Sequence, residues 1–380
     1  MRVRAVTSHG VIPEPPLDAP DEDWLVWADA MQQIGDLRGE LVALATLPAK
    51  RDAFVKKHAT ALLGNVVGRH VAKGTYRVTR WRHYRPDEIE VRISDATKGP
   101  SLVVDLLRSS HAAYLRGLAI AGVPRRDERL DLRATLGWLR ESALPRSLRS
   151  LALVDDHARS LEYLVSGDFE PPENRVAFGP LAELWPAFAQ IEELRMVVAD
   201  PGQIQFQVIR LPAVRSFTLE AKCWAGGLGA MLANSRWPQL TSLELTLCDM
   251  FIINERADAG RVVGNHRPTG WRGELTSIFE ALRGGPLERL ALRSFFDVDP
   301  VLDAIDGAEL PALVELDLSD SAIDREHAGR LASSPLVSQI RRLVLERVRL
   351  PSSRGFEGVP EVVHSTTHTA PAHRYFVTME

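Results

Sequence analysis

The histidines near the C-terminus have a spacing that could hold a metal ion. His364 and His368 are four residues apart and His373 follows them, so a helix here would bring imidazole nitrogens, which are common zinc ligands, to one face. The intervening Ser-Thr-Thr and the nearby Pro371 disfavour a helix. We therefore favour a polar tail without a metal or cofactor, in which residues 375–377 add a strand or pack on the fold; metal binding stays open as the alternative.

A second candidate site is the segment Gly-Asp-Leu-Arg-Gly-Glu at residues 35–40, which has the glycines and charges of a phosphate-binding or catalytic turn. A turn between two helices explains the same residues. Gly35 would adopt a positive φ angle and Asp36 would cap the following helix. Arg38 and Glu40 would then form local ion pairs. We favour this structural interpretation.

No other short motif predicts a reaction. The sequence has no Walker-type Gly-x-x-x-x-Gly-Lys and no Gly-x-Ser-x-Gly, and Gly226, Gly227 and Gly229 lack the lysine of a phosphate loop. Cys223 and Cys248 have no neighbours that would mark a reactive thiol. Two cysteines are too few for a secreted disulfide framework. There is also no apolar run of about 18 residues. We therefore expect a cytoplasmic protein with no enzymatic activity and no membrane association.

One short basic and aromatic run is of the kind that binds nucleic acid. It comprises Tyr76, Arg77, Arg80, Trp81, Arg82, His83, Tyr84 and Arg85. Three acidic residues, Asp87, Glu88 and Glu90, follow at once, and the chain has a net charge of -4, so no extended cationic field would attract a polyanion. We predict a solvated strand edge and no nucleic-acid partner.

The elements that would position any site follow from an internal repeat. The apolar spacing Leu-x-x-Leu-x-Leu recurs eight times, with middle residues Leu118, Leu151, Leu194, Phe217, Leu243, Leu290, Leu316 and Leu343. Successive middle residues are 33, 43, 23, 26, 47, 26 and 27 residues apart. Four of these steps lie in the range typical of leucine-rich repeats, and the three long steps require insertions. A strand with this pattern buries its leucines only against neighbouring repeats.

Helix-like segments lie between these short strands, so the repeating unit is a helix, a turn and a strand. They cover residues 132–139, 181–188, 228–233, 275–282, 301–305 and 326–331. The alternation predicts an α/β leucine-rich-repeat solenoid, in which a parallel sheet of about eight short strands has its helices on the outside.

The segment from Trp24 to Leu44 resembles the repeat-companion domain that precedes leucine-rich repeats in many bacterial proteins. The resemblance rests on Trp-Ala-Asp at residues 27–29 and on Gly-Asp-x-Arg-Gly-Glu at residues 35–40. Ala30 and Leu37 stand where that family usually has Trp and Pro. Trp81 and the stretches 89–93 and 109–118 also resemble the junction into the first repeats. The resemblance implies an architecture and no particular activity.

These patterns divide the chain into four parts. We predict an extended tail over residues 1–20, a helical cap over 21–85, the solenoid over 86–350 and a C-terminal tail over 351–380. Within the cap, the apolar spacing predicts helices from Asp21 to Gly35, over 37–47 and over 54–67. Within the solenoid, the polar stretch 251–272 is an insertion, with Trp271 as its anchor.

The repeat pattern also predicts a surface. Residues between and just after the leucines point away from the core and form the concave face of the sheet. The charged ones are Arg195, Glu220, Glu244, Arg289, Arg293, Glu315, Asp317, Arg342 and Glu346. Mixed charges suit a protein partner better than a polyanion. We predict a non-catalytic protein-binding scaffold. The alternatives are a substrate-recruiting part of a ligase-type enzyme and an obligate structural subunit of a larger assembly.

Overall fold

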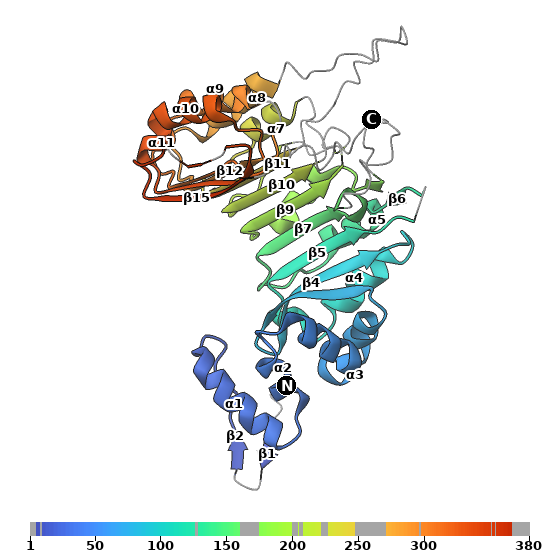
Figure 1. Ribbon diagram of the computed structural model, residues 1–380. Coiled ribbons are helices and arrows are strands. Elements are labelled where there is room, and N and C mark those ends of the chain that lie inside the picture. Colours follow the sequence, from blue (N-terminus) through green and yellow to red (C-terminus); the bar gives the residue numbers. More distant parts are fainter. Residues whose placement is uncertain are drawn as a thin grey trace, which may run out of the picture. The chain divides into compact units, whose positions relative to one another are not determined.

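The computed structural model describes residues 5–7, 10–125, 128–159, 175–199, 204, 208–221, 227–247, 271–295, 298–350, 352–353 and 355–366 (Figure 1). The chain forms two compact units. Unit 1 contains residues 1–121 and 142–148, and unit 2 contains residues 122–141 and 149–380.

Unit 1 begins its helical part with α1 (Asp21–Gln33), α2 (Leu37–Ala43) and α3 (Pro48–Ala72). Three acidic residues stabilise the first turn of α1 through the helix dipole. Helix α3 starts at a proline, where the missing N–H costs nothing. It is longer than the predicted 54–67, because it begins at Pro48 and continues to Ala72 through a bend at Gly64, where φ is +73°.

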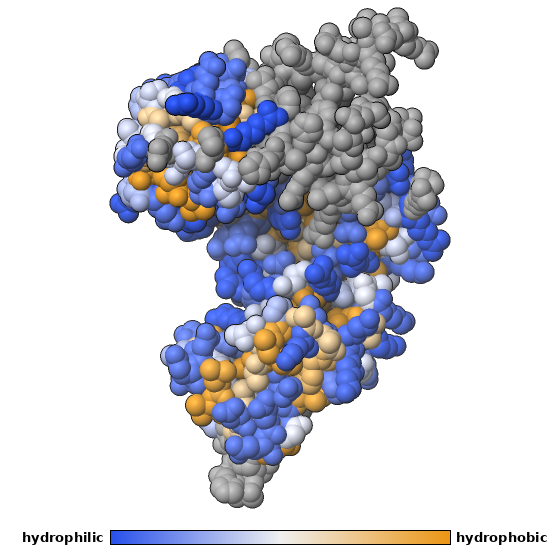
Figure 2. Space-filling model, viewed as in Figure 1, coloured by the Kyte–Doolittle hydropathy of each residue, from blue (hydrophilic) through white to orange (hydrophobic). Residues whose placement is uncertain are grey.

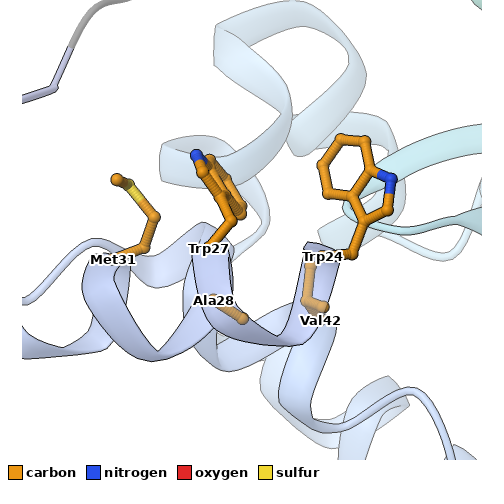
Figure 3. Packing of buried hydrophobic residues seen from close by; sticks show 5 residues of the cluster. All are labelled: Trp24, Trp27, Ala28, Met31 and Val42. Carbon is orange, nitrogen blue, oxygen red and sulfur yellow. The ribbon is translucent and has the colours of Figure 1, made fainter. Parts of the chain in front are cut away.

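The core between α1 and α2 is built on aromatic side chains. Trp24, Trp27 and Met31 leave α1 on the same side, at helical spacing, and Val42 comes from α2 (Figure 3). All four are at most 4% exposed. The periodicity of α1 therefore has the packing role expected of an amphipathic helix.

A β-hairpin follows the helices in unit 1. Strands β3 (Tyr76–Arg82) and β4 (Arg85–Ile93) pair antiparallel, and His83 in the turn has a φ of +58°. Helix α4 (Gly99–Leu107), the 3-10 turn η1 (Ala112–Tyr114) and strand β5 (Gly117–Gly122) come next. The predicted end of the cap at residue 85 would therefore separate the two paired strands of this hairpin.

The first twenty residues are not simply an extended tail. Strands β1 (Ala5–Thr7) and β2 (Gly10–Ile12) form an antiparallel pair. Further along, Arg85 lies 2.5 Å from Glu14, and the Arg82 guanidinium donates to the backbone oxygen of Leu17 at 2.9 Å. These contacts fix residues 14–17 against the β3–β4 hairpin. The prolines of the segment do not predict such long-range contacts.

Unit 2 contains a parallel sheet whose strands lie side by side in the order in which they occur along the chain. The order is β7-β9-β10-β11-β12-β13-β14-β15. The bounds are β7 (Ser150–Asp155), β9 (Glu193–Val198), β10 (Ser216–Ala221), β11 (Ser242–Leu247), β12 (Arg289–Arg293), β13 (Glu315–Asp317), β14 (Arg342–Val348) and β15 (Glu361–Thr366). Together with β5, seven of these strands confirm the eight predicted from the leucine spacing.

The register of this sheet aligns the repeats. Phe217 pairs with Leu243, Leu243 with Leu290, Leu290 with Leu316, and Leu316 with Leu343. Each is at most 2% exposed. Identical positions of successive repeats therefore stack on one another, and their leucine side chains form one continuous core.

Helices lie on one side of the C-terminal strands of this sheet (Figure 1). The α-helices of unit 2 are α5 (Arg133–Glu141), α6 (Asp156–Arg159), α7 (Leu228–Asn234), α8 (Trp271–Leu282), α9 (Asp299–Asp306), α10 (Arg325–Ser333) and α11 (Pro335–Gln339). Two short strands, β6 (Leu130–Asp131) and β8 (Val176–Ala177), pair separately. The predicted helix over 181–188 is wrong in type: it is a pair of 3-10 turns, η3 (Leu181–Glu183) and η4 (Trp185–Phe188), with Pro186 in the second.

Two boundaries of the predicted solenoid shift. Helix α8 begins at Trp271, so the predicted insertion 251–272 overlaps the helix by two residues; residues 251–270 lie outside the described part. The sheet also continues beyond residue 350, because β15 pairs in parallel with β14. His364 is therefore on a strand, where its Nε2 lies 3.0 Å from the backbone oxygen of Leu350. His368, His373 and residues 375–377 lie outside the described part.

None of the helices within the described ranges has the length and apolarity needed to cross a membrane.

Candidate protein-binding face

One face of the unit 2 sheet carries the predicted charged residues. On β10, Phe217 and Leu219 are fully buried, whereas Thr218 and Glu220 between and after them are partly exposed. The leucine side packs against helices: Leu243 of β11 lines a small apolar cavity with residues of α7 and α8. Because side chains alternate along a strand, the charged residues occupy the opposite face. We call this opposite face of β9–β15 the charged sheet face.

Charged side chains cross the charged sheet face from strand to strand in an ion-pair ladder. Arg289 of β12 lies 3.4 Å from Glu244 of β11 and 2.8 Å from Glu315 of β13. Arg342 of β14 continues the ladder, at 3.5 Å from Glu315 and 3.3 Å from Glu361 of β15. Two arginines are therefore each shared between carboxylates of the strands on either side.

A branch of the ladder reaches the most buried charge on this face. The Arg293 guanidinium contacts Glu244 at 2.8 Å and Asp317 at 2.5 Å. Asp317 is only 2% exposed and also accepts a hydrogen bond from the backbone N–H of Ser319 at 2.9 Å. Burial alone would raise the pKa of the Asp317 carboxyl, but the hydrogen bonds from Arg293 and Ser319 outweigh it and hold the pKa below its ordinary value.

Smaller pairs flank the ladder. Arg195 of β9 contacts Glu220 of β10 at 2.7 Å. At the other end, Arg347 contacts Glu346 at 3.6 Å and donates to Asp320 with Nε at 2.6 Å. All nine predicted face residues thus take part in cross-strand or local ion pairs on the same face.

Three members of this network were not predicted: Asp320, Arg347 and Glu361. Asp320 follows β13, and Arg347 lies near the end of β14. Their φ angles are +61° and +54°, so the alternation of side chains along a strand does not predict which way they point. Glu361 is the first residue of β15, in which Val362 and His364 pair with the inward-facing Leu343 and Leu345 of β14. Its register partner Arg342 lies only 19 residues earlier. The β-branched residues Val362 and Val363 are the signal in the sequence for this strand, but the segment lacks the leucine spacing.

Two of the four arginines in the predicted basic run of unit 1 form ion pairs with carboxylates. Arg80 contacts Asp87 at 2.6 Å, and Arg85 contacts Glu14. Arg85 also lies over the rings of Tyr84 and Tyr114, at 5.3 and 4.1 Å from their centroids. Most of these cations hold unit 1 together, which agrees with a strand edge more than with a polyanion site.

The segment at residues 35–40 forms a helix-to-helix turn. Gly35 has a φ of +73°, and Asp36 caps α2 by accepting from the backbone N–H of Arg38 at 2.9 Å. The Arg38 and Asp36 side chains form an ion pair at 2.5 Å, and Glu40 accepts from Gln32 at 2.8 Å. These contacts account for its charged residues without a ligand.

Within the described ranges, no three His, Cys, Asp or Glu side chains gather as metal ligands would. The tail histidines His368 and His373 lie outside those ranges, so their possible metal site stays the open alternative stated above.

Comparison with known proteins supports the fold. No protein-family model matches the chain, and no curated protein matches it. A solved Bacteroides fragilis protein is similar in structure, with a TM-score of 0.51, 12% sequence identity and coverage of 72% of each chain. An internalin from Listeria monocytogenes matches with a TM-score of 0.31 and 14% identity over 73% of this chain and 72% of its own. The leucine spacing, the sequential parallel strands and their flanking helices give this chain an α/β leucine-rich-repeat solenoid fold.

Proposed function

We propose that this protein is a non-catalytic interaction module and that the charged sheet face of unit 2 binds a protein partner. The observation that carries the proposal is the ion-pair ladder from Glu244 to Glu361. It fixes charged side chains of both signs on the face opposite the leucine core.

Mutual pairing prepares this face for binding. Long arginine side chains usually lose rotamer freedom when a partner immobilises them, which weakens binding. Here Arg289 and Arg293 are already held by carboxylates on both sides. Binding of a partner at this face therefore costs less side-chain entropy than binding to mobile arginines would.

The balance of charge indicates the kind of partner. Each arginine of the ladder has carboxylates beside it, so the face has no cationic excess for a nucleic-acid backbone. Accessible charges of both signs lie on it: the side chains of Arg195 and Arg342 are 45% and 44% exposed, and those of Glu220 and Glu361 are 34% and 59% exposed. Such a pattern fits a protein surface with complementary polar groups.

A site-specific photo-crosslinking experiment tests the location. One variant carries a photo-reactive residue at Thr218 on the charged sheet face, and a matched control carries it at Glu280, an exposed position on α8. In a lysate of the source cells we expect a discrete protein adduct from position 218 and none from position 280. Adducts from position 280 alone would contradict the proposal.

The protein identified in the adduct is then purified, and its affinity for variants of this chain tests which side chains lie in the interface. Arg195→Ala combined with Arg342→Ala should weaken binding at least tenfold, about 1.4 kcal/mol, with an unchanged melting temperature. The control is Arg283→Ala, which removes another half-exposed arginine, after α8. Equal affinities for the double variant and the wild-type protein would exclude these side chains from the interface.

A further inference from the structure

We propose that a cavity in unit 1, between α3 and the β3–β4 hairpin, binds a small anion that carries a planar ring, of the nucleoside monophosphate class. The cavity has a volume of about 390 Å³ and is lined by residues of α3, by the turn after it and by both strands of the hairpin. It is separate from the charged sheet face of unit 2, so its test does not depend on the function proposed there.

The walls of the cavity carry an excess of positive charge. Lys56, Lys73, Arg77 and Arg92 line it, against one carboxylate, Asp52. The chain as a whole has a net charge of -4, so this local cationic surplus is contrary to the overall composition. Cations grouped around a cavity of this size favour a bound anion.

The cations of this region fall into two groups. Arg80 and Arg85 are neutralised by Asp87 and Glu14. In contrast, Lys56, Lys73 and Arg77 are exposed, and no ion pair to a carboxylate is found for them among the described residues. Structural ion pairing therefore accounts for Arg80 and Arg85 but not for Lys56, Lys73 and Arg77.

A buried carboxylate fixes one of the cavity cations. Arg92 of β4 lies 3.0 Å from Glu90, which is 1% exposed. Because Glu90 is almost fully buried, its side chain has little freedom, and the pair holds the Arg92 guanidinium at the cavity wall. A positioned guanidinium is well suited to a phosphate or carboxylate group.

The other residues that line the cavity are apolar or aromatic, which favours a ligand with an apolar part beside its anionic group. Val55, Val71, Val78 and the half-buried Trp81 also line the cavity, and Tyr76 closes it as a fully buried side chain. An indole offers a face on which a planar ring stacks. The volume of about 390 Å³ lies within the range of small-molecule sites. A phosphate alone would leave much of it empty, whereas a nucleoside monophosphate would occupy both the cationic and the apolar walls.

Isothermal titration calorimetry on the full chain tests this proposal with three probes: adenosine monophosphate, inorganic phosphate and adenosine. We expect the monophosphate to bind at least tenfold more tightly than either part, and its affinity to fall as salt is added. If phosphate bound as tightly as the monophosphate, the planar ring would contribute nothing to binding, and that part of the proposal would be wrong. Absence of binding by all three probes at millimolar concentration would overturn the site.

Three variants locate the binding. Lys73→Gln combined with Arg77→Gln should weaken the monophosphate at least tenfold, and Trp81→Leu should weaken the monophosphate but leave the affinity for phosphate unchanged. Lys98→Gln is the matched control, since Lys98 is an exposed lysine of unit 1 that pairs with Asp95 and does not line the cavity. If circular dichroism shows all variants folded and their affinities equal that of wild type, the cavity is not the binding site.

Discussion

Asp317 is a carboxylate kept charged at a nearly buried position. Its 2% exposure would favour the neutral form. Arg293 and the Ser319 backbone reverse this preference, and the pKa falls below its ordinary value of 3.8. Arg293 in turn is shared with Glu244. The stability of this part of the sheet is therefore linked to the ionisation of one side chain.

Replacing this carboxylate should remove a pH-dependent part of the stability. A lowered pKa in the folded state gives stability that is complete above the unfolded pKa, near 4, and is lost as the pH falls through the folded pKa. We expect Asp317→Asn to lose on the order of 2 kcal/mol at pH 7, and the gap to wild type to narrow at pH 3. Urea unfolding at pH 7, 5 and 3 measures both quantities.

The control for this substitution is Asp306→Asn. Asp306 is an exposed partner of Arg330, and such surface pairs contribute about 0–1 kcal/mol. A loss for Asp317→Asn no greater than that of the control, or one that stays constant down to pH 3, would show that the Asp317 carboxylate is not coupled to folding.

Single residues show where sequence reasoning at this scale succeeds. Gly35 and Asp36 have the positive φ and the capping bond that were predicted, because both roles depend on local backbone geometry. The pairing of Arg289 with two strands was not predicted. It depends on the register between Arg289 and residues 45 positions before and 26 positions after it, which residue type alone does not specify.

At the scale of elements, the second glycine of the residue 35–40 segment determines how closely α1 and α2 approach. A Cβ atom at Gly39 would lie 2.5 Å from the backbone oxygen of Ala28 and 2.7 Å from the Met31 side chain. The helices can therefore contact each other at this point only without a side chain on α2. This requirement explains a glycine inside a helix, where glycine is otherwise unfavourable.

A pair of glycine substitutions tests this close contact. Gly39→Ala should destabilise the protein by about 1–3 kcal/mol, because one of the helices must move. Gly329→Ala in α10, where an added Cβ meets nothing within 4 Å, should stabilise it by about 0.5–1 kcal/mol. Chemical denaturation measures both. Equal effects of the two substitutions would refute a packing requirement at Gly39.

Elements were predictable where a periodic pattern was strong. The leucine spacing located the strands, since each leucine must face the core. The leucine spacing does not predict β15, because Val362 and His364 stand where β14 has Leu343 and Leu345 and because the step from β14 is short. The apolar residues of 181–188, such as Trp185 and Phe188, have helical spacing, but Pro186 interrupts the segment and it forms 3-10 turns.

At the scale of the whole molecule, a stacked array depends on contacts between neighbouring repeats. Each strand from β9 to β14 pairs only with the strands before and after it. Stability in such an array is close to a sum of repeat and nearest-neighbour terms. Damage to one repeat should therefore spread mainly to its neighbours, while distant repeats keep their structure.

Leu343→Ala should reveal this locality. Leu343 in β14 is fully buried, and its truncation should cost about 2–5 kcal/mol. We expect hydrogen exchange, followed by mass spectrometry, to show faster exchange over β13–β15 and little change over β9 and β10. Leu194→Ala in β9 should give the reverse pattern. Uniform acceleration throughout unit 2 in both variants would indicate one cooperative block.

The sequence predicted the fold class of the molecule, but its candidate site only in part. The nine predicted face residues do share one face, because strand alternation determines this directly. Their partner and the cavity of unit 1 were not predicted. The cavity walls come from residues 52–92, on a helix and two strands, and their convergence depends on tertiary packing.

The neighbour-only strand order also sets how the chain would respond to mechanical force. Leu290, Leu316 and Leu343 mark repeats that are 26 and 27 residues apart along the chain. Pulled by its two ends, the array would yield from a terminus inward, since an outer strand has one partner strand and an inner strand has two. Each ruptured repeat would lengthen the tether by roughly 90 Å, so the solenoid would behave as an extensible spring that lengthens in discrete steps.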